Sequence, residues 1–198
     1  MTTIHYEKPS ESLKVNLGCG QFPMPGFVNV DVDPNTKADV FHDLSQFPYP
    51  FAPCSCAYIE MSHVLEHLPD PIAAMRELHR ILAPEGTLRI KVPHFSRALT
   101  HYDHRRGFDV TFPRYFSPDF SGGYTGIHFE ADSVRFRWFA QPWLKQKELS
   151  PLAYHLGSIL GGIFDFLGNL APYATSRLFC YWVGGYDEIE FLLRKGNS

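Results

Sequence analysis

A strand–helix–strand pattern near the middle of the chain limits the fold most strongly. Residues 57–61 form a short apolar segment, and residues 70–82 follow with apolar side chains at helical spacing. Asp70 is a suitable helix N-cap, and Pro71 suits the first helical position. Residues 87–92 then resemble the next strand. Because a helix that joins two strands in this way is typical of a parallel sheet, the sequence predicts an α/β fold.

Short apolar segments before and after this unit extend the predicted sheet. Three of them precede it, at residues 13–18, 27–31 and 39–41, and each is bounded by turn residues. Residues 188–193 alternate between apolar and polar side chains, as a last strand with one polar face does. At 198 residues the chain suits one domain over residues 1–198.

The residues that end the predicted strands indicate a site for a nucleotide-like ligand. Such ligands bind a parallel sheet at the carboxyl ends of its strands. Glycines at the end of the first strand let a ligand approach the backbone, and an acid that ends the second strand can accept hydrogen bonds from ribose hydroxyls. Taken singly, a glycine pair is a tight turn and the acid a solvated cap. The residues in these positions are Gly18, Gly20, Asp31, Asp43, Leu44, Ser62 and His63.

Five motifs in order carry a resemblance to a known family. They are Val15-Asn16-Leu17-Gly18-Cys19-Gly20, Gly26-Phe27-Val28-Asn29-Val30-Asp31, Asp39-Val40-Phe41-His42-Asp43-Leu44, Ser62-His63-Val64-Leu65-Glu66-His67-Leu68, and the run from Leu78 to Ile90. With them, residues 13–95 resemble the type 11-like branch of the class I S-adenosylmethionine (SAM) dependent methyltransferases. The resemblance implies a Rossmann-like sheet, mostly parallel with an antiparallel C-terminal strand, and SAM as the cofactor.

The resemblance also implies which residues hold the cofactor. The loop after the first strand would contact the methionine end of SAM, and the end of the second strand would contact the ribose. The third strand end would face the adenine, and the fourth would lie near the reacting centre. The implied cofactor residues are Leu17, Gly18, Cys19, Gly20, Asp31, Val32, Asp43, Leu44, Ser62 and His63.

One departure from the family pattern lies between the first two strands. Only about seven residues separate Gly20 from the second strand, whereas a parallel crossover commonly needs a dozen or more, often with a helix. We therefore expect the first crossover helix to be reduced or absent, with the loop at residues 21–25 in its place. Its loss would remove a helix N-terminus that often helps to bind the cofactor.

The densest polar cluster follows the fifth strand, on the expected active edge of the sheet. A hydroxyl acceptor needs a base within hydrogen-bond reach, and His104 is our candidate, with His63 and Asp103 as further catalytic residues. Insertions at 94–125 and 145–185 are expected on the substrate side or as a lid. An exposed ion pair within a solvated loop would explain the cluster equally well. The substrate-binding candidates are His94, His101, Arg105 and Arg106.

Two other classes of function compete with methyl transfer. His63, Glu66 and His67 match the H-x-x-E-H motif of a zinc hydrolase, but this motif needs both histidines on one helix face. Here Pro69 follows directly, so no metal is expected. The second alternative is a noncatalytic SAM-binding or interaction protein that uses the apolar segment 152–170.

Composition limits the partners. The formal charge of −3 and the absence of a strongly basic stretch argue against nucleic acid. Segment 152–170 is shorter than the roughly 20 residues of a membrane span, so it is expected to be a core or lid helix. The same helix is a candidate homodimer interface. Family members of this type are associated with small molecules, sugars or glycan precursors as acceptors.

The first residues and the cysteines indicate where in the cell the protein is expected. Met1 to Glu7 show no basic segment followed by an apolar run, so a signal peptide is not expected. The four cysteines have no zinc-ribbon spacing, and we expect reduced thiols in a cytoplasmic protein.

Overall fold

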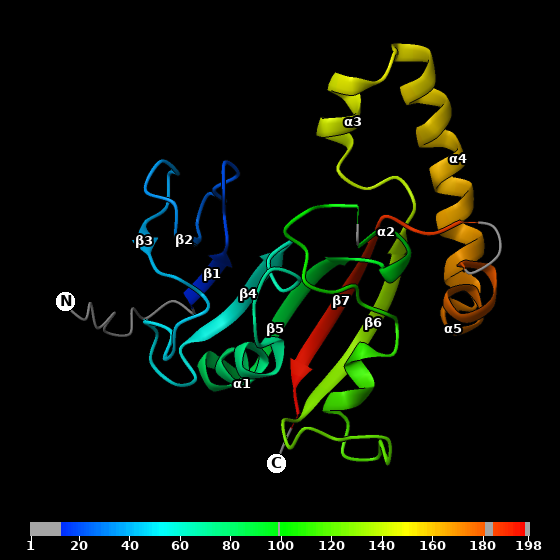
Figure 1. Cartoon of the computed structure of the whole chain (residues 1–198). Helices are drawn as coiled ribbons and strands as arrows, with labels where there is room; N and C mark the ends of the chain where they lie inside the picture. The colour runs from blue at the N-terminus through cyan, green and yellow to red at the C-terminus, as the bar shows by residue number, and fades with distance from the viewer. Residues whose placement is uncertain (1–12, 99, 181–183, 197–198) are drawn as a thin grey trace.

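One mixed seven-stranded sheet organises the molecule (Figure 1). The computed structural model describes residues 13–98, 100–180 and 184–196. The strand order in the sheet is β3-β2-β1-β4-β5-β7-β6. The strands are β1 (Leu13–Leu17), β2 (Val28–Asp31), β3 (Val40–Phe41), β4 (Cys56–Ser62), β5 (Leu82–Pro93), β6 (Phe129–Arg137) and β7 (Glu188–Lys195).

The direction of the strands confirms the predicted sheet. β1 to β5 pair in parallel, and β7 runs antiparallel between β5 and β6. β5 begins at Leu82, directly after the helix and earlier than the expected residue 87, because Leu82 pairs with Cys56 ahead of a bulge. β6 was not predicted from the sequence, because this edge strand is mostly polar and exposed and has no apolar alternation.

The helices surround the sheet unevenly. α1 (Pro71–Ile81) is the predicted central helix, and its N-cap Asp70 accepts hydrogen bonds from the backbone N–H groups of Ile72 and Ala73 at 3.0 and 2.9 Å. α4 (Pro151–Leu170) confirms the predicted helix at 152–170. No helix in the described part of the chain is long and apolar enough to cross a membrane. The remaining elements are α2 (Phe95–Ala98), η1 (Phe112–Phe116), α3 (Pro142–Glu148), α5 (Pro172–Ala174) and η2 (Thr175–Phe179).

The core lies along the central strands. Interior side chains of β1, β4, β5 and β7, such as Leu17, Ile59, Ile90 and Phe191, are fully buried. α1 packs Leu78 and its apolar neighbours into the same cluster. This rigid centre fixes the carboxyl ends of β1 and β4, where the expected site lies.

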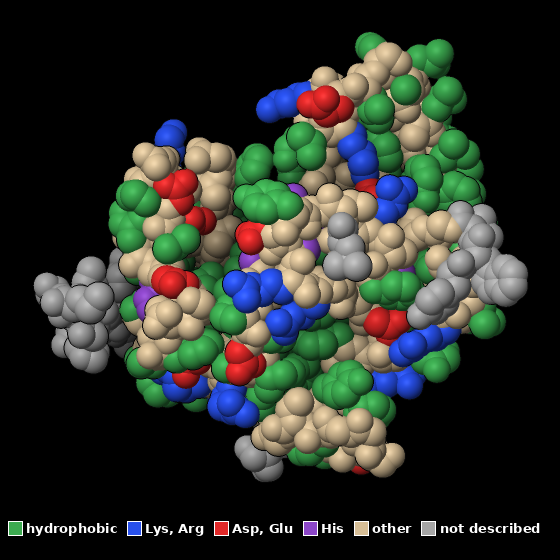
Figure 2. All heavy atoms as spheres, viewed as in Figure 1, with side chains coloured by type: hydrophobic (Ala, Val, Ile, Leu, Met, Phe, Trp, Pro, Cys, Tyr) green, Lys and Arg blue, Asp and Glu red, His purple; other side chains and the backbone are tan. Residues whose placement is uncertain are grey.

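β6 is an edge strand, and α4 satisfies part of its backbone through side chains. The Asn169 amide accepts a hydrogen bond from Phe136 N at 2.8 Å and donates to Phe136 O at 3.1 Å. The Asp165 carboxylate accepts from Trp138 N at 2.6 Å. α3 and the first turns of α4 project past the carboxyl ends of the parallel strands (Figure 1). Figure 2 shows apolar side chains gathered over this projection.

Candidate functional site

The connection from β1 to β2 contains no helix, which confirms that the first crossover helix is absent. Two buried asparagines hold the loop in its place. Asn16 donates from Nδ2 to Asn29 Oδ1 at 3.0 Å and to Phe22 O at 3.3 Å. Met24 N donates to the same Asn29 oxygen at 2.7 Å. These two residues were not predicted as structural residues, although a polar amide inside each of two apolar strands was the available signal.

The glycine turn after β1 leaves room for a ligand. Gly18 has a φ of +70°, and a Cβ there would lie 2.2 Å from Val64 Cγ2. Gly20 has a φ of +50°, and no atom lies within 4 Å of the place where its Cβ would be. The first glycine therefore serves close packing inside the protein, whereas the second opens the backbone toward space that a cofactor can fill.

The carboxylate of Asp31 is fixed beside this turn. Its Oδ2 accepts a hydrogen bond from Gly20 N at 2.7 Å, and its Oδ1 accepts from Asp33 N at 3.0 Å. Each oxygen keeps lone-pair capacity for a ribose hydroxyl. Val32 is exposed next to it. Burial and the nearby Asp31 charge raise the pKa of the Cys19 thiol, so Cys19 stays neutral at the base of the turn.

Asp43 and Leu44 follow β3 and differ in what they offer. Hydrogen bonds from Ser45 lower the pKa of Asp43, so its exposed side chain is a carboxylate at neutral pH. Leu44 is buried, and its carbonyl accepts a hydrogen bond from the Tyr49 hydroxyl at 3.0 Å. Of these two residues, only Asp43 presents a polar side chain at the surface.

His63 directly follows Ser62, the last residue of β4, and has a left-handed conformation with a φ of +55°. Its Nε2 lies 2.8 Å from Glu188 Oε2, and its Nδ1 lies 3.3 Å from Glu66 Oε1. Burial alone would lower its pKa, but these two carboxylates outweigh burial and raise the pKa to about 9. His63 is therefore protonated at neutral pH and is a fixed cation rather than a base.

The loop after β5 is tied to the turn that follows β4. Arg105 N donates to Glu66 O at 3.0 Å, and the Arg106 guanidinium donates to Pro69 O at 3.0 Å. Asp103 Oδ2 lies 3.0 Å from His67 Nδ1. These contacts hold the 101–106 segment against the turn that follows β4.

The rings of three histidines gather where this segment meets the turn after β4. His101 stacks on His104 with ring centroids 4.7 Å apart, and His67 meets His104 edge-on at 4.8 Å. His104 Nδ1 donates to Ala98 O at 2.6 Å, which leaves Nε2 as its unprotonated nitrogen in the neutral ring.

His94 lies apart from this group, although the sequence placed it on the substrate side. It is fully buried, with Nδ1 at 2.7 Å from Ser96 Oγ and Nε2 at 3.0 Å from Ser176 Oγ. Burial lowers its pKa to about 4, so the ring is neutral. Both nitrogens are engaged inside the protein, so His94 joins β5 to η2 and offers no exposed ring nitrogen to a substrate.

The zinc hydrolase motif lacks its expected geometry. Residues 65–67 form a turn and not a helix, so His63 and His67 do not share a helix face. His63 instead contacts Glu188 on β7. The structure therefore contradicts the peptidase arrangement of the His63, Glu66 and His67 set.

α3 approaches the glycine turn from the other side. Trp143 packs against Phe22 with ring centroids 5.3 Å apart. Lys145 forms an ion pair with Asp187 and donates to Ala140 O at 2.9 Å, which anchors α3 to the start of the last strand region. α3 thus contacts both the loop that replaces the first crossover helix and the segment before β7.

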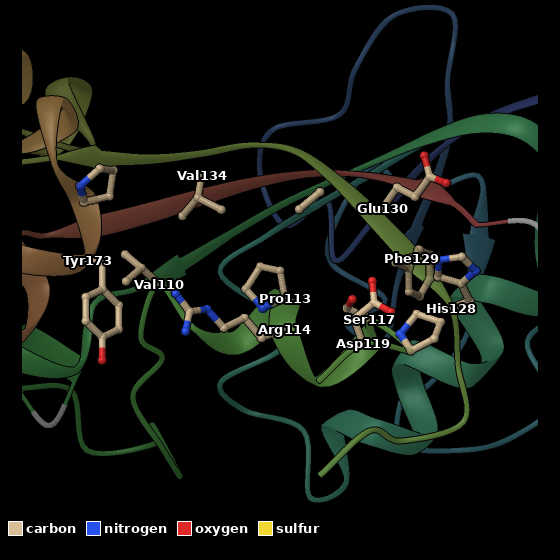
Figure 3. A pocket seen from close by; sticks show the side chains of 13 residues that line it. Val110, Pro113, Arg114, Ser117, Asp119, His128, Phe129, Glu130, Val134 and Tyr173 are labelled. Carbon is tan, nitrogen blue, oxygen red and sulfur yellow. The ribbon is translucent and has the colours of Figure 1, made fainter. Parts of the chain in front are cut away.

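A cavity of about 780 Å³ lies elsewhere, beside η1 and β6 (Figure 3). Val110, Arg114, Phe129 and Tyr173 contribute to its wall. It includes none of the residues expected to bind cofactor or acceptor, and it flanks the edge strand rather than the carboxyl ends of β1 and β4. We therefore place the candidate site at the glycine turn.

Comparison with known proteins identifies the family. A model of the methyltransferase domain family matches residues 17–120, which is more than half of the 198-residue chain. The chain therefore belongs to this family, and its sheet is that of a class I SAM-dependent methyltransferase. The family implies SAM as the cofactor, and the open glycine turn beside Asp31 fits it. No curated protein is significantly similar in sequence.

Solved structures share the fold at low sequence identity. A SAM-dependent methyltransferase from Archaeoglobus fulgidus superposes with a TM-score of 0.57 at 13% identity, covering 94% of this chain and 87% of that chain. One from Mesorhizobium loti gives 0.54 at 12% identity, covering 92% and 90%. The [4+2]-cyclase SpnF gives 0.53 at 14% identity, covering 94% and 75%.

Proposed function

We propose that this protein transfers the methyl group of SAM to a small-molecule or glycan-precursor acceptor. The observation that carries the proposal is the open space at Gly20 next to the fixed carboxylate of Asp31. A cofactor with a ribose and a methionine end would bind against both. SAM, when bound, supplies a methyl group activated for in-line displacement.

The chain's own contribution is to position the reactants and exclude water. We assign Leu17, Gly18, Cys19 and Gly20 to the methionine end, and Asp31 with Val32 to the ribose. Asp43 with Leu44 would face the adenine, and Ser62 and His63 would border the reacting centre. The contact of Trp143 with Phe22 supports α3 and α4 as a cover over this edge, in agreement with a lid at 145–185.

The acceptor is proposed to bind beside segment 101–106. His101 and Arg105 are exposed there, so the segment can offer charge to an anionic group. The sequence-based assignment of His104 as the base stays a prediction. Its side chain is only 12% exposed, and its Nε2 lies 3.9 Å from Glu66 Oε1, so it faces inward rather than toward solvent.

A noncatalytic SAM-binding protein is the second candidate. The missing first crossover helix favours it, because a helix N-terminus that often helps to hold the cofactor is absent. The fold alone does not decide, since one protein of the same fold is named a cyclase.

Location and assembly stay predictions from the sequence. The four cysteines are unpaired, which suits a cytoplasmic location. A homodimer through α4 would cover its exposed apolar side chains, and equilibrium sedimentation would detect it. Those side chains are Leu152, Leu156, Ile159, Leu160, Ile163, Phe166, Leu167 and Leu170.

Calorimetric titration with SAM and its demethylated product tests the function. We expect both to bind, and Asp31→Asn to weaken binding by about 10- to 100-fold, because hydrogen bonds to a charged group contribute about 1.5–3 kcal/mol. Asp33→Asn is the matched control, since Asp33 neighbours the site on the exposed turn. Absence of binding by the wild-type protein would contradict the proposal. Formation of demethylated SAM with a panel of hydroxyl acceptors separates the transferase from the noncatalytic alternative.

A further inference from the structure

Glu66 is a buried carboxylate whose surroundings do not satisfy it. It lies on the turn after β4 and is 0% exposed, yet neither of its oxygens accepts a hydrogen bond from the described residues. His63 Nδ1 lies 3.3 Å from Oε1, at ion-pair distance but without hydrogen-bond geometry, and His63 binds Glu188 through its other nitrogen. A buried charge that lacks hydrogen bonds is costly, so a further positive partner is expected.

Two histidines approach this carboxylate from different segments. His67 follows it on the same turn, and His104 comes from the loop after β5 with Nε2 at 3.9 Å from Glu66 Oε1. One ligand atom from each of the three residues lies within 4.8 Å of the others, so small side-chain movements would bring them to the separations of a tetrahedral zinc site. No single stretch of sequence contains this set.

Both imidazoles are oriented as in known metal sites. His104 donates Nδ1–H to the carbonyl of Ala98 at 2.6 Å, and His67 Nδ1 lies 3.0 Å from Asp103 Oδ2. A metal-bound histidine almost always donates its second nitrogen to a carboxylate or a backbone carbonyl, which fixes the tautomer. In both rings this leaves the Nε2 lone pair as a ligand.

We propose that Glu66, His67 and His104 bind a divalent transition-metal ion of the zinc class. Two imidazoles with one carboxylate are a common ligand set for zinc that keeps one position open. The His67 side chain is 30% exposed, so the site has access to solvent. This set differs from the peptidase motif, because His104 replaces His63.

A cation at this position would have a role in the proposed methyl transfer. That role, unlike the binding of the metal, rests on the proposed function. The site adjoins segment 101–106, where the acceptor is proposed to bind. A bound cation there would hold an oxygen of the acceptor and favour loss of its proton to solvent. His104 would then be a metal ligand, and the acceptor atom would be oxygen.

Metal binding is measured on tag-free, full-length protein that has been treated with chelator and dialysed. Titration with Zn²⁺ alone is expected to show one ion bound per chain, and Co²⁺ is expected to give the visible absorption of a low-coordinate site. Glu66→Gln, His67→Gln and His104→Gln should each weaken Zn²⁺ binding by more than about 100-fold, since loss of an outer partner already costs about 10- to 100-fold. Asp103→Asn should show that smaller, 10- to 100-fold loss.

His155→Gln is the matched control, because His155 is an exposed histidine on α4 outside the set, and its Zn²⁺ affinity should equal that of the wild type. Absence of stoichiometric Zn²⁺ on the wild-type protein overturns the inference, as does unchanged affinity in all three ligand variants. Circular dichroism confirms that each variant is folded. SAM titration on the same samples keeps the proposals apart, because zinc without SAM binding refutes only the transferase, and SAM without zinc refutes only the metal site.

Discussion

α1 and α4 pack against the same sheet in different ways. α1 has 11 residues, and its buried members include Met75, Leu78 and Ile81 in the central cluster. α4 has 20 residues, yet only Gly161 and Gly168 are buried. The more apolar of the two helices is thus the one that lies in solvent.

The difference follows from what each helix covers. α1 lies over the centre of the parallel sheet, where large side chains interdigitate. α4 reaches the end of the edge strand β6 and the residues just past it through the polar side chains of Asp165 and Asn169, and its glycines closely approach Phe139 and Tyr186. Burial of apolar side chains therefore stabilises the packing of α1. The packing of α4 depends on a few hydrogen bonds, and its apolar surface stays exposed.

Truncation of Leu78 to alanine should give the largest effect. Leu78 is fully buried, so the change removes apolar contacts and leaves a cavity, at a cost of about 2–5 kcal/mol in the free energy of unfolding. Urea denaturation measures this quantity. Arg76→Ala, on the exposed side of the same helix, should stay within about 0.5 kcal/mol. A cost below about 1 kcal/mol for Leu78→Ala would break the comparison between the two helices.

Acid should destabilise the contact that His94 makes between β5 and η2. Burial holds its folded pKa at about 4, below the ordinary value of 6.5, so its contribution to stability is complete above pH 6.5 and is lost as the pH falls toward 4. Between pH 7 and pH 5 the loss should be about 2 kcal/mol, at about 1.4 kcal/mol per pH unit.

The control for this pH dependence is His94→Gln, which cannot titrate. Urea denaturation at the two pH values should show a change smaller by about 2 kcal/mol in the variant than in the wild type. Equal changes in both proteins would show that His94 does not carry the effect.

Alanine in place of Gly162 should give the smallest effect, and in the opposite direction. A Cβ added at this position of α4 would have no atom within 4 Å, so the substitution should stabilise by about 0.5–1 kcal/mol through helix propensity. Thermal unfolding measures it. Gly161→Ala is the matched test, because its Cβ would lie 2.7 Å from Phe139 Cβ and should destabilise by about 1–3 kcal/mol. Equal responses at the two glycines would contradict the packing of α4 described above.

The sequence predicted the first region well. The Asp70 cap and the apolar spacing of α1 depend only on residues close together in the sequence. The parallel strands follow from the connecting helix. β6 was not predicted because its exposed positions are polar, so its sequence lacks the apolar–polar alternation of a strand. The roles of Asn16 and Asn29 were not predicted because their hydrogen-bond partners are distant in sequence or lie in a loop of irregular shape.

By itself, then, the sequence determined the parallel sheet, the glycine turn, the acid at the end of β2 and the missing crossover helix. Only the tertiary structure decided the surroundings of the histidines, because these depend on which loops meet at one edge. It buried His94 between β5 and η2, paired His63 with Glu188, and brought His104 to Glu66 and His67. Residues far apart in the chain can form one site only when folding packs their segments against each other.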